Sequence, residues 1–125
     1  MGDEMSSIHI VCKANQSGGH INLSEVDETH CKSGCWYFLP SMGKKLGTLT
    51  GGWIYLHESR KQLSYIGGVI TEIQPCTKKK GTNGSAFIFE NRSQGKGQSW
   101  RGLDNAKAIH GWIVPSDLPH ERLNV

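Results

Sequence analysis

The amino-acid sequence predicts a small α+β domain that is mostly β. Its 125 residues fit one domain with its own hydrophobic core, so we treat residues 1–125 as a single unit. Sixteen glycines and a hydrophobic content of 36% favour short strands joined by turns over a helical bundle. Helix is therefore expected in only one or two short segments.

The first third of the chain contains two predicted strands and one weak helix signal. Residues 8–12 are a β-prone run that ends in the turn-forming cluster 15–19, which predicts a first strand. Residues 22–28 carry a serine cap followed three positions later by an acidic residue, a pattern that can start a helix. Residues 35–39 are apolar and aromatic and end at Pro40, which predicts a second strand.

The clearest β region lies in the middle of the chain. Residues 53–57 and 65–73 are strand-like runs separated by the polar loop 58–64. Two glycines, Gly67 and Gly68, interrupt the second run, and glycine inside a strand marks a bulge or a close approach of backbones. These glycines predict strong curvature of the strand, and this curvature favours a small bent β-barrel.

The last third is predicted to alternate strands with polar loops. A lysine-rich loop at 78–85 precedes a strand at 86–90. The segment 93–102 has almost no apolar content before its tryptophan, and we expect it to be the functional loop. Residues 103–110 favour a short helix, and residues 111–115 a last strand followed by a polar tail.

The charges are distributed unevenly along the chain. Residues 1–30 carry one lysine against five acidic residues, whereas residues 31–107 carry twelve basic residues against four acidic ones. Trp36, Trp53 and Trp100 lie within the basic part, and cations with aromatic rings are the residue types that pair phosphates and stack bases. The alternative is a solvated lysine-rich surface over tryptophans that belong to the core.

Taken in order, these segments resemble the PUA-like superfamily of small bent β-barrels, which includes EVE, ASCH and YTH-type modules. The resemblance covers residues 35–115 and rests on the strand with Trp36, the runs 51–57 and 65–73, residues 87–89 and the polar loop with Trp100. The Gly-x-Lys-x-x-Glu-x-Arg signature of the ASCH group is absent. The resemblance implies binding of RNA or DNA, often with a modified base flipped into an aromatic pocket.

The sequence therefore predicts a non-catalytic nucleic-acid-binding module that needs no cofactor. A flipped base needs an aromatic face and hydrogen bonds to its edge, while cations hold the backbone. The resemblance places Trp36 and Trp100 near the base, whereas Trp53 and Trp112, inside strand-like runs, are expected in the core. The predicted binding residues are Trp36, Lys44, Lys45, Arg60, Lys61, Lys96, Gln98, Ser99, Trp100 and Arg101.

The main alternative is a small zinc-stabilised protein-interaction module. His9, Cys12, Cys31 and Cys35 are zinc-compatible residues that could form a four-ligand site. Their spacing differs from paired Cys-x-x-Cys knuckles, and cysteines in apolar strands pack as small hydrophobes. Cys76 is left without a role.

A nucleic-acid-processing enzyme has less support. His57 and Glu58 suggest acid–base chemistry, but adjacent residues of a strand point to opposite faces and would not share a site. Nothing in the sequence fixes a pair of cysteine and histidine as a nucleophile and its base.

The sequence favours a cytoplasmic protein without a membrane partner. No apolar run approaches the roughly 20 residues that span a bilayer, and the first residues lack the pattern of a signal peptide. Asn-x-Ser sequons begin at Asn15, Asn22, Asn83 and Asn91, and we interpret them as polar turns.

Overall fold

The computed structural model describes residues 6–13, 23–36, 46, 48–77, 83–101 and 111–122. The chain is mostly β, as predicted. In chain order the elements are β1 (Ser6–Val11), β2 (Leu23–Glu25), β3 (His30–Trp36), β4 (Trp53–His57), β5 (Ser64–Thr77), β6 (Asn83–Asn91), the 3-10 helix η3 (Ser93–Gly95), β7 (Gly111–Pro115) and α2 (Pro119–Arg122).

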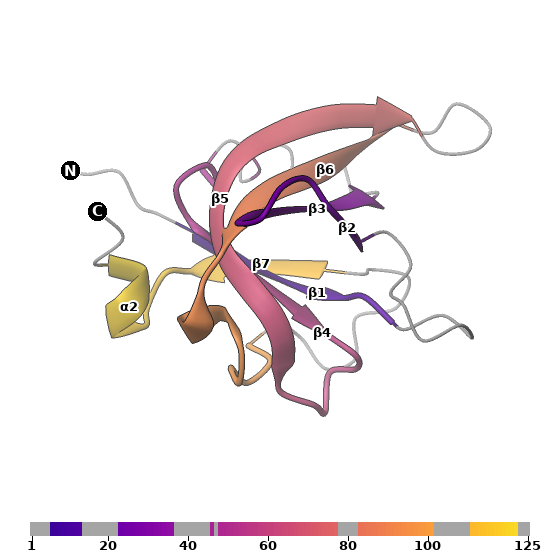
Figure 1. The fold of residues 1–125 in the computed structure, drawn as a ribbon. Coiled ribbons are helices and arrows are strands. Elements are labelled where there is room, and N and C mark those ends of the chain that lie inside the picture. The colour runs from indigo at the N-terminus through magenta and orange to yellow at the C-terminus, as the bar shows by residue number, and fades with distance from the viewer. Residues whose placement is uncertain are drawn as a thin grey trace.

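The strands of the described residues belong to one mixed sheet of seven strands (Figure 1). Their order is β2-β3-β6-β5-β4-β1-β7, with β1 parallel to β4 and every other neighbouring pair antiparallel. Strands β2 and β7 form the two edges, so in the described part of the chain the sheet is open. The described strands therefore do not show the small bent barrel that the sequence predicts.

Strands β4 and β1 are buried on both faces. In β4 all five residues are buried, because Ile54 and Leu56 face the hydrophobic core while their neighbours face a second, more polar layer. The same alternation in β1 places Ile8 and Ile10 in the core. Because β1 and β4 are in parallel register, with Ser7 opposite Trp53, their two polar faces form one continuous surface.

The hydrophobic core lies on the other face of these strands. Its buried members come from six strands, from Cys12 directly after β1 and from the segment before β4. They are Ile8, Ile10, Cys12, Cys31, Trp36, Leu49, Ile54, Leu56, Ile70, Phe87, Phe89 and Ile113. Strands β5 and β6 form a long antiparallel pair, and Figure 1 shows β5 bending strongly along its length with β6 beside it.

The curvature predicted at Gly67 and Gly68 is present in β5. A Cβ atom at Gly68 would lie 1.7 Å from the carbonyl oxygen of Glu90, and one at Gly67 would lie 2.3 Å from that of Ile54. Both positions therefore require glycine, because neighbouring backbones approach too closely for a side chain. The register of β5 against β6 then shifts between Ile70 and Glu72, which marks a bulge.

A disulfide joins Cys35 of β3 to Cys76 of β5, with the two Cα atoms 5.9 Å apart. Strand β6 lies between these two strands, and Gly84 of β6 leaves room for the bond, since a Cβ there would lie 2.6 Å from the Cys35 sulfur. The expectation that Cys76 has no role is wrong. Cys12 and Cys31 are free and buried.

Two predicted helices have different outcomes. Of the segment 22–28, the described residues 23–28 form β2 and a bend instead of a helix. The predicted helix at 103–110 lies outside the described residues. In the described part of the chain, no helix is both long and apolar enough to cross a membrane.

Candidate functional site

The polar face of β1 and β4 carries a row of four aromatic rings. Trp53 stacks on Tyr55 with ring centres 6.0 Å apart, and Tyr55 stacks on His9 at 4.7 Å. His9 in turn stacks on His57 at 5.0 Å. The alternation of each strand sends these side chains to one face, and the parallel register brings the two sets together. We call these four residues the aromatic row.

Two further rings pack against the aromatic row at nearly right angles. Trp100 meets His57 at 5.2 Å between centres and His9 at 5.8 Å, with interplanar angles of 80° and 73°. At the other end His120 of α2 meets Trp53 at 4.7 Å and 85°. Edge-to-face contacts of this kind stabilise aromatic clusters and fix the ring orientations. Trp100 therefore covers one end of the aromatic row, and His120 of α2 covers the other.

A chain of hydrogen bonds runs through the two histidines of the row. Nε of Arg101 donates to Nε2 of His9 at 3.2 Å, and Nδ1 of His9 lies 2.8 Å from Nε2 of His57. Nδ1 of His57 lies 2.9 Å from the carbonyl oxygen of Gln62. Arginine only donates and a carbonyl only accepts, so each histidine carries its proton on Nδ1.

The environment keeps both histidines neutral. Burial, the His57 ring and the charge of Arg101 lower the pKa of His9 to about 2. Burial also lowers the pKa of His57, although its hydrogen bond to Gln62 acts in the opposite direction. Neutral rings agree with the hydrogen-bond chain, in which each imidazole donates once and accepts once.

The carboxylate of Glu121 is the most heavily bonded group of this layer. Its Oε2 atom accepts hydrogen bonds from Ser7 Oγ at 2.9 Å, Tyr55 Oη at 2.5 Å and Arg101 Nη2 at 2.5 Å. Its Oε1 atom accepts from the backbone N–H of Leu118 at 3.0 Å. Burial and the bond to Glu121 raise the pKa of Tyr55, so its hydroxyl stays a donor. Glu121 thus ties α2 to β1 and β4.

A basic and partly aromatic surface lies outside the aromatic row. The guanidinium of Arg60 sits 5.8 Å from the centre of the Trp100 ring. The start of β5 holds the Trp100 segment in place, because Ser64 N–H donates to the Gln98 carbonyl and Gln98 N–H donates to Ser64 Oγ. We call this region the Trp100 surface, and it comprises Arg60, Lys61, Lys96, Gln98, Ser99 and Trp100.

Trp36 and Arg101, which were also predicted to bind, are not part of this surface. Trp36 is 4% exposed in the hydrophobic core, and its Nε1 donates to Ser33 Oγ at 2.9 Å, so it has no free face for stacking. The side chain of Arg101 is 21% exposed and is paired with Glu121. Lys44 and Lys45 lie outside the described residues. Trp53 is buried, as predicted.

The residues that sequence reasoning missed are those of the buried polar layer. The signal is the alternation of polar or aromatic residues with isoleucine and leucine, as at Ser7 and His9 and again at Tyr55 and His57. The pattern marks a face that differs from the hydrophobic core. It does not reveal that the polar face of β1 and the polar face of β4 lie side by side, because that depends on the pairing of the two strands.

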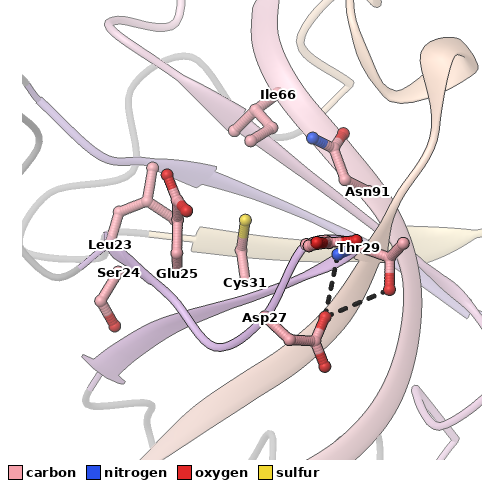
Figure 2. Close-up of a pocket in the computed structure, with 9 residues that line it drawn as sticks. Leu23, Ser24, Glu25, Asp27, Thr29, Cys31, Ile66 and Asn91 are labelled. Atoms are coloured by element: carbon pink, nitrogen blue, oxygen red, sulfur yellow. Dashed lines mark hydrogen bonds between the residues drawn. The ribbon is translucent and has the colours of Figure 1, made fainter.

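An acidic pocket of about 470 Å³ lies between the turn that follows β2 and the end of β6 (Figure 2). Glu25, Asp27 and Glu28 line it together with the buried Cys31, whose pKa burial raises. Backbone and side-chain hydrogen bonds from Thr29 and His30 lower the pKa of Asp27 to about 2. Figure 2 shows this carboxylate turned toward Thr29, so it organises the loop.

The proposed zinc ligands are not assembled. Cys35 is bonded to Cys76, and His9 is engaged with Arg101 and His57. Within the described ranges no three histidine, cysteine or acidic side chains are grouped so as to hold a metal ion.

No protein-family model, curated protein or solved structure matches this chain. Any functional conclusion therefore depends on the geometry of its own residues.

Proposed function

We propose that this chain is a non-catalytic module that binds a single strand of nucleic acid on the Trp100 surface. The observation that supports the proposal is the position of the Arg60 guanidinium over the Trp100 ring, and two exposed lysines, Lys61 and Lys96, are near these residues in the sequence. A strand of nucleic acid presents bases and phosphates in alternation, and this surface presents an aromatic ring among cations.

The physical basis is stacking combined with electrostatic attraction. One base stacked on a tryptophan contributes about 1 to 3 kcal/mol, and an arginine at the ring adds a cation–π contact. Lysines at the edge attract phosphates and make binding depend on salt. Because His9 and His57 hold the Trp100 ring edge-on, the ring needs little ordering when a base arrives.

Gln98 and Ser99 are the residues proposed to contact the edge of the base. Ser99 is exposed. The Gln98 side-chain nitrogen donates to the Gln94 carbonyl at 3.1 Å, and the Gln98 side-chain oxygen is the atom proposed to accept a hydrogen bond from the base. Recognition of a modified or flipped base at this position is part of the proposal. The choice between DNA and RNA follows from the binding experiment below.

Two finer assignments remain predictions. The mostly β content agrees with a PUA-like domain, whereas the open sheet lacks the closure of a barrel. A cytoplasmic location is expected from the sequence, but the disulfide between Cys35 and Cys76 weighs against it, because disulfides are rare in reducing compartments.

The proposal is tested by fluorescence anisotropy with labelled single-stranded and duplex DNA and RNA, with and without modified bases, at two salt concentrations. We expect salt-sensitive binding to a single strand, weakened about tenfold or more by Trp100→Ala and less by Lys61→Gln with Lys96→Gln. Lys32→Gln on β3 is the matched control, since it removes one charge at a distant part of the sheet. The proposal would be contradicted if Lys32→Gln weakened nucleic-acid binding as much as Lys61→Gln alone or Lys96→Gln alone. It would also be contradicted if the chain bound no nucleic acid at low salt.

A further inference from the structure

We propose that Ser7, Tyr55 and Arg101 form a binding site for a terminal phosphate of a nucleic-acid strand, and that Glu121 occupies this site in the free protein. The inference rests on the proposed nucleic-acid function. It adds a second site, a specific ligand group and a competition between that group and the chain's own C-terminal segment.

The three donors converge on a single atom. Ser7 Oγ, Tyr55 Oη and Arg101 Nη2 lie 2.9, 2.5 and 2.5 Å from Oε2 of Glu121. Ser7 and Tyr55 are fully buried, and Arg101 supplies a positive charge at the rim. Convergent donors around one oxygen, with a guanidinium among them, are the usual design of a site for an anion.

The donors and the carboxylate belong to parts of the fold that differ in how firmly they are held. Ser7 and Tyr55 lie on β1 and β4, which are hydrogen-bonded neighbours inside the sheet. Glu121 lies on α2, a helix of four residues that has no stability of its own at this length. The sheet therefore presents a preformed site, and α2 covers it through the contacts of its side chains.

Local sequence explains how α2 presents its carboxylate. Pro119 is the first helical residue, where its missing N–H costs nothing, and Glu121 reaches back to the N–H of Leu118. This half of a capping box orients Oε1 toward Leu118 and Oε2 toward the sheet. His120, which lies between Pro119 and Glu121 in the chain, places its ring against Trp53. The segment thus inserts one anion and one ring into the polar layer.

A phosphate monoester can replace this carboxylate. It supplies three acceptor oxygens and nearly two negative charges at neutral pH, whereas Glu121 supplies two oxygens and at most one charge. A phosphodiester inside a strand carries one charge and two bulky substituents, so only a terminal phosphate fits a site whose walls are buried. In the same polar layer, Trp53 stacks on Tyr55, and its Nε1 is buried without a hydrogen-bond partner in the described structure.

The anion site and the Trp100 surface are connected. Arg101 follows Trp100 directly in the chain, and both side chains contact His9. A strand stacked on Trp100 can therefore place its end at Arg101, where the phosphate displaces Glu121. Displacement of α2 is the conformational change that accompanies binding.

The first test needs no nucleic acid. Thermal unfolding of Glu121→Ala is measured in inorganic phosphate and in chloride of equal ionic strength. The control is Glu28→Ala, which removes an exposed acidic residue between β2 and β3, at the other end of the strand order from β1. Phosphate is expected to raise the Tm of Glu121→Ala by about 4 °C more than that of the control. If Glu121→Ala does not fold without anions, Glu121→Gln gives the same comparison. Equal shifts in both proteins would overturn the anion site.

The second test identifies the source of the phosphate. Binding of one oligonucleotide is compared with a 5′-phosphate, with a 3′-phosphate and with hydroxyl ends, alongside a nucleoside monophosphate. Glu121→Ala is expected to prefer one phosphorylated end by about tenfold, and Glu121→Ala with Arg101→Gln is expected to lose that preference. Stabilisation by inorganic phosphate without a preference for either end would overturn the assignment to nucleic-acid ends. Absence of binding by every oligonucleotide to the wild-type chain would instead count against the Trp100 surface.

Discussion

Nδ1 of His9 lies 2.8 Å from Nε2 of His57, and partners on the far side of each ring determine which nitrogen of each carries the proton. The two histidines therefore form a directed chain from Arg101 to the Gln62 carbonyl. A proton added to either ring would place two donors face to face at one link of the chain. The buried layer is consequently stable only while both rings are neutral.

We expect stability to fall as the pH drops below about 6.5. The pKa of His9 in the folded chain is about 2 and that of His57 is lowered, so the unfolded chain takes up these protons first. The free energy of unfolding should decrease by about 1.4 kcal/mol per pH unit for each histidine. Urea denaturation between about pH 7.5 and 5 measures this slope before most carboxylates titrate.

The matched variant for this prediction is His9→Asn, whose amide nitrogen can donate in place of Nδ1. It should be less stable than the wild type at pH 7.5 but should lose stability less steeply on acidification. A slope that is unchanged in His9→Asn would show that His9 is not the group responsible.

Gly95→Ala should be strongly destabilising, whereas Gly97→Ala should be tolerated better. A Cβ at Gly95 would lie 2.2 Å from the carbonyl carbon of Gly67, so η3 would have to move away from β5. At Gly97 nothing lies within 4 Å, and only its φ of 86° costs about 1 kcal/mol in alanine. Chemical denaturation gives both values, and Gly95→Ala should also weaken nucleic-acid binding because η3 leads into the Trp100 segment. Similar losses in the two variants would contradict the close packing of Gly95 on Gly67.

Trp36→Ala and Trp100→Ala should separate stability from binding. Trp36 lies in the hydrophobic core, so its truncation should cost about 3 to 5 kcal/mol of unfolding free energy. Trp36→Phe, which keeps a ring but loses the bond to Ser33, should bind nucleic acid like the wild type. Reduced binding by a fully folded Trp36→Phe would return Trp36 to the binding site.

Loss of the disulfide should destabilise the chain without changing its fold. Closing a loop across 41 positions contributes about 3 to 4 kcal/mol in the chain-entropy account, which Cys35→Ser with Cys76→Ser would remove. Denaturant midpoints with and without a reducing agent measure this difference. Alkylation of the denatured, unreduced protein should label Cys12 and Cys31 alone. Labelling of all the cysteines would contradict the pairing.

Much of the sheet could be predicted because its signals are local. Residues 53–57 and 111–115 are strands with the expected bounds, since turn residues or polar segments flank short β-prone runs. The helix expected at 22–28 did not form. Asp27 instead accepts hydrogen bonds from the backbone N–H groups of Thr29 and His30, and this turn competes with helix formation.

The candidate site could be predicted only in part. Arg60 and Trp100 were both predicted, but their contact depends on the hydrogen bonds between Ser64 and Gln98. Trp36 lies in the apolar run 35–39, which is typical of a core strand, but the resemblance to PUA-like domains placed it near the base instead. The pairing of Cys35 with Cys76 depends on tertiary structure, since spacing does not determine the connectivity of cysteines.

The position of β1 also affects how the chain can be synthesised and folded. This first strand lies between β4 and β7, so its two edges are completed by residues that emerge much later from the ribosome. Its isoleucines and its histidine remain exposed until then, and the delay favours contact with chaperones or other nascent chains. Fusing a second copy of residues 111–122 ahead of β1 would give this strand an early partner, which suggests a route to higher yields of the folded protein.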